Sequence, residues 1–395
     1  MTQDARNSLP MQADIQDDLR TAFRGAVRLA LEGFLEEELE EMIGARWYER
    51  TAGRRDTRNG SYRRGLLTSL GQIEVRVPRG RESGSPGEES LGRYRRRTEE
   101  IDAAICEAYV GGVSTRGMER VTRALSGEGV QRSTVSRITR RLDEQVEGLR
   151  RAPIEGPVPY LYLDATFLDV RWARQVENVS ALVAYGIDGE GKRRLLAITI
   201  GVQESEESWA ELLRQLVDRG LSGVRLVISD AHAGLAGAIR RFLPEAEHQR
   251  CTVHLTRNVV AKVPQRLRKR VAREVVRILH APSLAEAKKR KAAFESGLGA
   301  HVPEAAQCLA EGFSPATRYF AYPREHWLRI RSTNGLERLH GEIKRRTRAV
   351  GAFPDRASAL RLVTAVALQV TAVWSDRCYI DVSLLIHDNE EAQSA

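Results

Sequence analysis

The stretch PYLYLDATFLDV, residues 159–170, decides the fold class, because its dense apolar pattern predicts a β-strand. Two more predicted strands follow, VENVSALVAYGI at 176–187 and RRLLAITIGV at 193–202. The segment DGEGK between these two is typical of a tight hairpin turn. The region therefore begins with three strands joined by short turns.

Strands then alternate with helices. Residues 207–221 and 232–243 have the apolar spacing of amphipathic helices, and the strand VRLVIS at 224–229 lies between them. After Thr256 the sequence becomes helical and basic to about residue 312, with no further strand pattern. We therefore predict an α/β fold with a mixed sheet covered on both faces and interrupted by an all-helical insertion. The predicted domains are a first core part at 153–262, the insertion at 263–325, and a second core part at 326–395 that ends in a helix.

The N-terminal third has a different organisation, predicted as three regions: a helical segment at 1–50, a small arginine-rich β region at 51–98 and a helix-turn-helix-like region at 99–152. Residues 14–50 read as a helix, and its apolar stripe either packs on its own subunit or forms a subunit interface. The stripe consists of Leu19, Phe23, Val27, Leu31, Phe34 and Leu35, and an acidic run from Glu36 to Glu41 lies beside it.

The two middle regions carry turn and cap signals. In 51–98, Asn59-Gly60 is a turn signal and Ile73, Val75 and Val77 alternate as in a strand. In 99–152, one helix is predicted from Ser114 to Leu125 and a second from Ser133, which we expect to be its N-cap. The second helix is a candidate for the DNA major groove.

The composition excludes several protein classes. Among 395 residues, 42% are hydrophobic and 29% charged, and no apolar run is long enough to span a membrane. The four cysteines form no CxxC pair, and the N-terminus lacks a secretory pattern. We therefore expect a cytoplasmic, nucleoid-associated protein with reduced thiols.

Basic residues are unevenly distributed. Between Arg50 and Arg97 there are 13 arginines, no lysine and 5 acidic residues, and residues 318–348 hold 9 basic and 3 acidic residues. Clustered arginine suits bidentate contact with phosphates and predicts nucleic-acid binding. The candidate DNA contacts are Arg54, Arg55, Arg58, Arg63, Arg64, Arg79, Arg137, Arg140, Lys344, Arg345 and Arg348.

Three acidic residues stand where a metal site is expected. Asp164 interrupts the apolar strand, and a buried carboxylate is costly unless it is paired or binds a cation. Asp230 follows the strand 224–229, at the carboxyl edge where α/β sheets build their sites. Glu337 lies on a helix expected to be capped near Ser332 or Asn334, in a stripe with basic residues. Three such carboxylates suit two Mg²⁺ ions, which prefer oxygen ligands and stabilise phosphoryl transfer.

Other acidic residues have simpler explanations. Asp169 lies an odd number of residues from Asp164 and therefore points to the opposite face of the strand. Asp188 is a turn former in DGEGK, and Glu342 faces away from Glu337. We expect these three acids to be structural.

Several long motifs together resemble the mutator-type transposases of bacterial insertion sequences. They are RNGSYRRG (58–65), GQIEVRVPRGR (71–81), YLYLDATFLDVR (160–171), GVQESEESWAELLRQLVDRGL (201–221), LVISDAHAGL (226–235), QRCTVHLTRN (249–258) and STNGLERLHGEIKRRTR (332–348). The resemblance runs from about residue 15 to 375. It implies a ribonuclease-H-like catalytic fold with an Asp-Asp-Glu triad, which falls on Asp164, Asp230 and Glu337.

The resemblance also covers two motifs of uncertain role. The family's Cys-x-x-His signature is present as Cys251 and His254. A structural zinc site normally needs four ligands, so packing or DNA positioning near the metals is the favoured interpretation. Trp209 is either a core aromatic residue or a contact for an unpaired base.

The resemblance implies a transposase that binds terminal inverted repeats and target DNA and catalyses Mg²⁺-dependent strand cleavage and transfer, with Mn²⁺ able to replace Mg²⁺. Two alternatives are a catalytically inactive, transposase-derived DNA-binding protein and a ribonuclease-H-type nuclease. The intact acids argue against the first, and the N-terminal DNA-binding third argues against the second. A mobile element has two ends, so we expect a homodimer or higher multimer.

Overall fold

The computed structural model describes residues 12–87, 96–173 and 175–385, which form two compact units, 1–140 and 141–395. The first unit begins with helix α1 (Gln12–Ile43) and the antiparallel hairpin of β1 (Arg58–Thr68) and β2 (Gly71–Gly80). Val27, Leu31 and Leu35 of α1 pack on Ile73, Val75 and Val77 of β2. Both interpretations of the apolar stripe therefore keep some support, because Leu19, Phe23 and Phe34 remain more than half exposed.

Two local expectations in this unit were wrong. Asn59-Gly60 is not the turn between the strands. Gly60 has a φ of +71° inside β1, at a register irregularity, and the strands turn at 68–71. Helix α1 ends at Ile43 rather than near residue 50. Gly44 adopts a φ of +74°, and a Cβ there would lie 2.4 Å from the carbonyl oxygen of Gly53.

Three helices complete the first unit: α2 (Glu99–Val110), α3 (Thr115–Ser126) and α4 (Arg132–Ile138). The α3–α4 pair matches the predicted helix pair, with the Ser114 side chain accepting from the Gly117 N–H at the start of α3. The N-cap of α4 is Gln131, and Ser133 lies inside the helix. Helix α2 was not predicted from the sequence, and it packs on both α3 and α4.

The second unit is built on a five-stranded mixed sheet with the order β5-β4-β3-β6-β7, as the sequence predicted in outline. Its strands are β3 (Tyr160–Trp172), β4 (Gln175–Ile187), β5 (Arg193–Gly201), β6 (Leu226–Ser229) and β7 (Glu247–Arg250). The first three run antiparallel, and β6 and β7 add in parallel beside β3. The polar strand β7 was not predicted, because EHQR has no apolar alternation.

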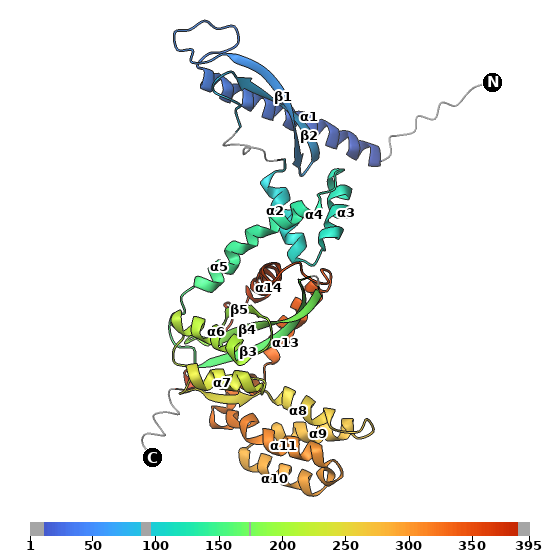
Figure 1. Cartoon of the computed structure of the whole chain (residues 1–395), viewed down its shortest axis with the longest axis vertical. Coiled ribbons are helices and arrows are strands. Elements are labelled where there is room, and N and C mark those ends of the chain that lie inside the picture. Colours follow the sequence, from blue (N-terminus) through green and yellow to red (C-terminus); the bar gives the residue numbers. More distant parts are fainter. Residues whose placement is uncertain (1–11, 88–95, 174, 386–395) are drawn as a thin grey trace, which may run out of the picture. The chain divides into compact units, whose positions relative to one another are not determined.

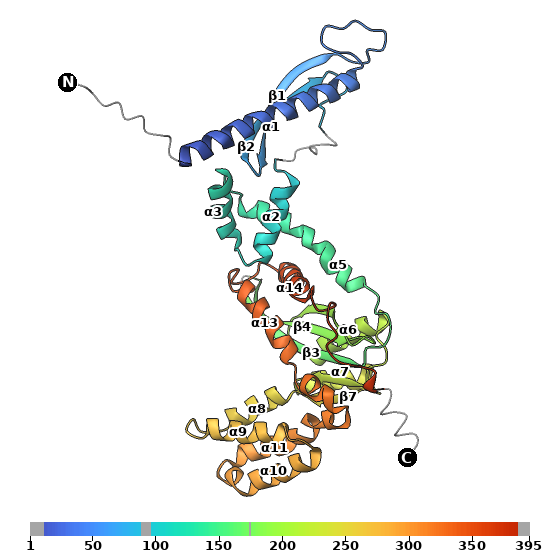
Figure 2. The same ribbon diagram turned by 180° about the vertical axis from the view of Figure 1, so that it is seen from behind.

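Helices cover both faces of this sheet (Figures 1 and 2). Leu161 and Leu163 of β3 face α6 (Glu206–Asp218) and α7 (Ala233–Phe242) in the main core. The alternate residues face α13 (Asn334–Thr347) and α14 (Arg356–Thr371), so Tyr162 and Asp164 share that side. The short helix α5 (Asp143–Arg151) is anchored to α14 by Asp143, which accepts two hydrogen bonds from Arg361 at 2.7 and 3.0 Å.

Between β7 and α13 the chain forms a helical insertion with its own apolar core. It contains α8 (Thr252–Ala261), α9 (Arg268–Leu279), α10 (Leu284–Ser296) and α11 (Pro303–Ala316), followed by the short helix α12 (Trp327–Ile330). The Thr252 N–H donates to the Arg331 carbonyl oxygen at 3.0 Å, so the insertion leaves and rejoins the core at one point. No helix in the described ranges is both long and apolar enough to cross a membrane.

Candidate active site

Asp164 is placed in the middle of β3, on the face covered by α13. Its side chain is 11% exposed, and its Oδ1 accepts from the Ala165 N–H at 3.0 Å. The Nδ1 of His340 on α13 lies 3.5 Å from its Oδ2. Burial raises the pKa of Asp164 to about 6, Asp230 and Glu204 add to the rise, and His254 opposes it. Asp164 is thus a buried carboxylate that a nearby cation would stabilise.

Asp230 directly follows β6 and lies at the carboxyl edge of the sheet, as predicted. Its Oδ1 accepts from the Ala231 N–H at 2.7 Å. The parallel pairing of β3 with β6 brings this edge beside Asp164, and each of these two carboxylates affects the pKa of His254. Because α/β sheets commonly place ligand-binding groups at this edge, the two aspartates occupy an expected location for chemistry.

His254 on α8 supplies positive charge to the two aspartates. The Cys251 thiol, Asp230 and Asp164 outweigh the effect of burial and raise the pKa of His254 to about 9. An imidazolium near two carboxylates partly compensates their charge. His340 differs, because burial, Lys344 and His254 lower its pKa to about 4, so it is neutral beside Asp164 at pH 7.

Cys251 connects this centre to the helix of the third acid. It is fully buried before α8, and its Sγ accepts from the Thr333 N–H at 3.4 Å and the Thr333 hydroxyl at 3.5 Å. Burial raises its pKa, but His254 and Thr333 outweigh burial and lower the pKa overall. Thr333 is the N-cap of α13, rather than Ser332 or Asn334. These contacts agree with a packing role for the Cys-x-x-His motif.

Glu337 lies in the first turn of α13 and is held by an arginine of α8. The Nη2 of Arg257 donates to its Oε1 at 2.5 Å. Within the described part of the chain, no three His, Cys, Asp or Glu side chains lie close enough to hold a metal ion. The structure thus brings Asp164 and Asp230 together and leaves Glu337 paired with Arg257.

The three acidic residues expected to be structural each form a local contact away from the candidate site. Asp169 lies on the exposed side of β3 and accepts from the Asn178 side chain at 3.0 Å. Asp188 accepts from the backbone N–H groups of Glu190 and Lys192 in the hairpin turn. Glu342 pairs with Arg345 at 2.8 Å.

Trp209 is a core aromatic residue, the simpler of its two interpretations. It is fully buried, and its Nε1 donates to Glu204 Oε1 at 3.3 Å. Its ring is therefore not open to an unpaired base. Trp209 instead holds Glu204, one of the carboxylates that raise the pKa of Asp164.

Sequence reasoning missed Glu204, Arg257 and His340 as members of this site. His340 was detectable, since it is polar and lies three residues after Glu337 and four after Leu336, within one helical face. The pairing of Arg257 with Glu337 joins residues 80 positions apart and has no local sequence signal.

The candidate DNA-binding residues have mixed environments. Arg54, Arg55, Arg137, Arg140, Lys344 and Arg348 are exposed, and Arg64 is half-buried. Arg140 belongs to a short 3-10 helix, Thr139–Leu142, after α4. Arg63 and Arg345 are exposed but pair with Glu74 and Glu342, and Arg79 lies over the Tyr62 ring.

Arg58 lies in a different environment from these residues. Its side chain is 12% exposed, pairs with Glu36 and Glu40 of α1, and lies 4.3 Å from the centre of the Trp47 ring. Its donors are therefore used inside the first unit. Arg58 holds α1 to the hairpin, and its contact with a DNA phosphate stays a prediction.

Comparison with known proteins identifies the family. The family described as "Transposase, Mutator family" matches residues 1–376. The chain is 38% identical over 353 residues to the transposase for insertion sequence element ISRM5 of Rhizobium meliloti, covering 89% of this chain and 88% of the relative. It is 36% identical to the transposase for IS256 in transposon Tn4001 of Staphylococcus aureus, over 88% and 90% of the two chains, and 35% identical to the transposase for IS1081 of Mycobacterium tuberculosis, over 92% and 88%.

Among solved structures, a simian T-cell lymphotropic virus intasome in complex with PP2A regulatory subunit B56 gamma matches at 12% identity. It covers 45% of this chain and 69% of that chain, and its TM-score of 0.16 is too low for a fold comparison. The sequence relatives and the family match are decisive. The chain belongs to the Mutator family of transposases.

Proposed function

We propose that this protein binds the terminal inverted repeats of an insertion sequence and catalyses metal-dependent DNA cleavage and strand transfer. The proposal is carried by one observation: parallel pairing of β3 with β6 brings Asp164 and Asp230 to neighbouring positions of the sheet, in a chain whose relatives are insertion sequence transposases. The sheet supports a ribonuclease-H-like core, since three antiparallel strands are extended by two parallel strands beside the first.

The donor chemistry fits a hard divalent cation. Asp164 and Asp230 offer carboxylate oxygens, and Asp164 has the raised pKa of a buried carboxylate without enough positive charge around it. Asp164, Asp230 and Glu337 would hold the ions. When bound, two Mg²⁺ or Mn²⁺ ions stabilise the attacking and leaving oxygens of an in-line displacement at phosphorus.

The surrounding residues prepare this site. His254 compensates the charge of the two aspartates while no cation is bound. Arg257 donates to the Oε1 of Glu337, so its positive charge would disfavour a metal cation at this carboxylate. Further along α13, Lys344 and Arg348 are exposed and suited to hold a DNA phosphate.

Neutral substitutions test the three acids. Asp164→Asn, Asp230→Asn and Glu337→Gln should each reduce cleavage of terminal-repeat DNA in Mg²⁺ by at least about a hundredfold, with end binding nearly unchanged, because each removes a ligand charge and keeps the shape. Glu342→Gln is the matched control on α13, since Glu342 pairs with Arg345. Full cleavage by Glu337→Gln together with loss in Glu342→Gln would refute the assignment.

We also propose that the working unit is a dimer or higher multimer. Leu19, Phe23 and Phe34 form an exposed apolar surface on α1 that the hairpin does not cover. Light scattering of the protein, alone and with end DNA, should give at least a dimeric mass, and Leu19→Asp with Phe23→Asp should reduce it. A monomeric mass in both states with cleavage retained would contradict this proposal.

A further inference from the structure

The helical insertion contains the most basic segment described in this protein. Residues 257–291 hold 12 arginine and lysine residues and 2 glutamates, a balance of +10. The whole chain has a net charge of +9, so the other 360 residues together carry −1. The positive charge of the chain is thus equivalent to the charge of this one segment.

The fold of the insertion places this charge on its surface. On α9, Val271, Val275 and Ile278 are fully buried in the insertion core. At 100° per residue, Lys269 and Arg273 lie on the opposite side of α9 and Arg270 lies on its flank, and all three are exposed. Lys262 and Arg266 in the preceding loop and Lys288 and Lys289 on α10 are exposed as well.

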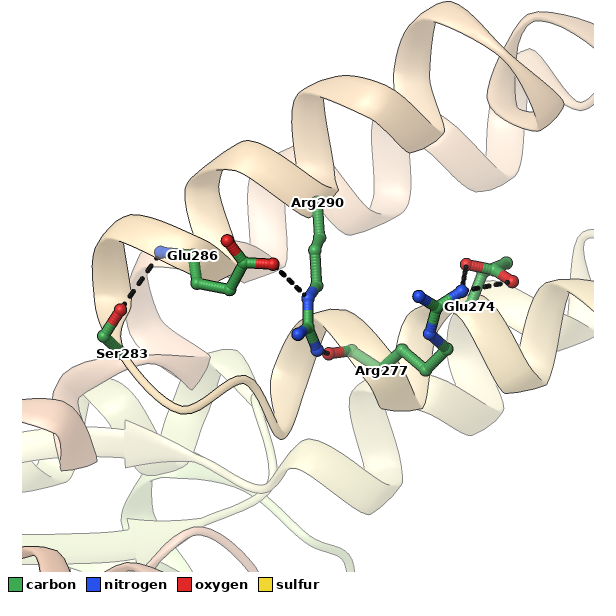
Figure 3. Close-up of polar contacts among 5 residues, drawn as sticks. All are labelled: Glu274, Arg277, Ser283, Glu286 and Arg290. Atoms are coloured by element: carbon green, nitrogen blue, oxygen red, sulfur yellow. Dashed lines mark hydrogen bonds and ion pairs between the residues drawn. The ribbon is translucent and has the colours of Figure 1, made fainter.

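The two acidic residues of the segment are already paired, as Figure 3 shows. Glu274 accepts from Arg277 at 3.1 and 3.2 Å. Glu286 accepts from the Nε of Arg290 at 2.7 Å, and the Nη1 of Arg290 donates to the Arg277 carbonyl oxygen at 2.8 Å. These contacts join α9 to α10 and leave no acid of the segment to neutralise the remaining cations.

We define the insertion basic surface as the exposed cations of residues 257–291 whose side chains form no ion pair and no hydrogen bond within the described ranges: Lys262, Arg266, Lys269, Arg270, Arg273, Lys288 and Lys289. A surface of this kind strongly attracts polyanions. Three of its members are arginines, whose planar donors match phosphate oxygens.

We infer that the insertion basic surface binds the phosphate backbone of duplex DNA, an inference that rests on the proposed function. The helix α8 supports it, because its first turn places His254 near Asp164 and Asp230 and its other end leads to Lys262. From Lys269 to Arg273, the free cations of α9 span about 6 Å at 1.5 Å per residue. This length corresponds to roughly two nucleotides of one strand. Along α8, Lys262 lies about 12 Å from His254, so DNA bound at this surface can extend toward the proposed catalytic carboxylates.

The test uses the full-length protein and a duplex of arbitrary sequence, with binding measured by fluorescence anisotropy over a range of salt concentrations. The variant Lys269→Gln/Arg270→Gln/Arg273→Gln should bind at least tenfold more weakly at low salt. Its slope of log affinity against log salt should fall by about 0.9 for each phosphate that the variant no longer neutralises. Circular dichroism should show unchanged helix content, since these side chains lie outside the core.

A matched control is Arg277→Gln/Arg290→Gln, which removes arginines of the same helices whose charge is already paired. Its salt slope should stay within error of wild type. An unchanged salt slope in the triple variant would overturn the inference. Wild-type protein that binds anionic phospholipid vesicles but does not bind the duplex would overturn it as well.

The outcomes separate this inference from the proposed function. Asp164→Asn should bind the arbitrary duplex with the wild-type salt slope and should fail to cleave terminal-repeat DNA. Loss of cleavage in Asp164→Asn with an unchanged slope in the triple variant would leave the proposed function intact and reject the DNA-binding role of the insertion. Full cleavage by Asp164→Asn together with a reduced salt slope in the triple variant would reject the proposed function and support the DNA-binding role of the insertion.

Discussion

Two basic regions, residues 50–97 and 257–291, have similar net charges of +8 and +10. They differ in whether their basic side chains form ion pairs or remain exposed and unpaired. In the first, Arg58 pairs with Glu36 and Glu40 of α1, and Arg97 pairs with Asp102 at 2.8 Å. In the second, Lys269, Arg270 and Arg273 are exposed, and the local glutamates are bound to other arginines. Because the acids that neutralise the first region lie outside it, a local charge count overstates its free positive charge.

The comparison implies that burial and partners, rather than the number of charges, decide what a charged residue does. A buried, paired charge holds elements together, whereas an exposed, unpaired charge is free for a ligand. Asp164 represents a third environment, a buried negative charge with too little positive charge near it to offset its burial. Each environment gives a different expected effect of removing the charge.

The largest effect is expected at Asp164. In metal-free protein with EDTA at pH 8, Asp164→Asn should raise the free energy of unfolding by about 3 kcal/mol, the equivalent of a pKa raised from 3.8 to about 6. Because the folded pKa is the higher one, wild type gains relative stability as pH falls. The difference should be complete above pH 6 and vanish below about pH 4. Urea unfolding at several pH values measures it, and a variant less stable than wild type at pH 8 would break the comparison.

An intermediate effect is expected at Arg58. Arg58→Ala should destabilise the packing of α1 on the hairpin by about 2 kcal/mol, because it leaves Glu36 and Glu40 without their shared partner. Hydrogen exchange of the β2 amide groups should accelerate accordingly, while exchange in β3 stays unchanged. If hydrogen exchange of β2 did not change and DNA affinity fell instead, Arg58 would be a DNA contact and not a structural ion pair.

The smallest effect on stability is expected at Arg63, whose pair with Glu74 is exposed on both sides. Arg63→Ala should leave β2 exchange unchanged, because exposed pairs contribute little. Its salt slope for DNA binding should nevertheless fall by about 0.9, as for one neutralised phosphate. A change in exchange without a change in slope would move Arg63 into the structural group with Arg58.

The strands of the sheet that have clear local patterns could be predicted. Strands β3, β4 and β5 have dense apolar runs, and Asp188 to Lys192 forms the expected turn. Strand β7 could not be predicted in the same way, because its pairing with β6 and not its composition makes it a strand. Asn59-Gly60 was misread since a glycine with positive φ serves a strand irregularity as well as a turn.

The candidate site shows the same limit. Asp164 and Asp230 were placed correctly at the sheet, because the apolar run of β3 and the end of β6 are both visible in the sequence. The ion pair of Glu337 with Arg257 and the burial of Trp209 against Glu204 depend on contacts between distant segments. Arg58 was assigned to DNA for the same reason, since its acidic partners lie on α1.

The hydrogen bond from Thr252 to Arg331 has a consequence for protein engineering and for evolution. It fixes the two ends of a long excursion at one point of the core, so the chain between them closes a loop. Doubling the length of such a loop costs only about 0.6 kcal/mol of closure entropy when the loop is flexible. Material can therefore be added to the loops of the insertion beyond α8 at little cost to the core, provided that residues 252 and 331 keep their positions and α8 keeps His254 and Arg257 at the site. These loops are suitable sites for grafting other domains.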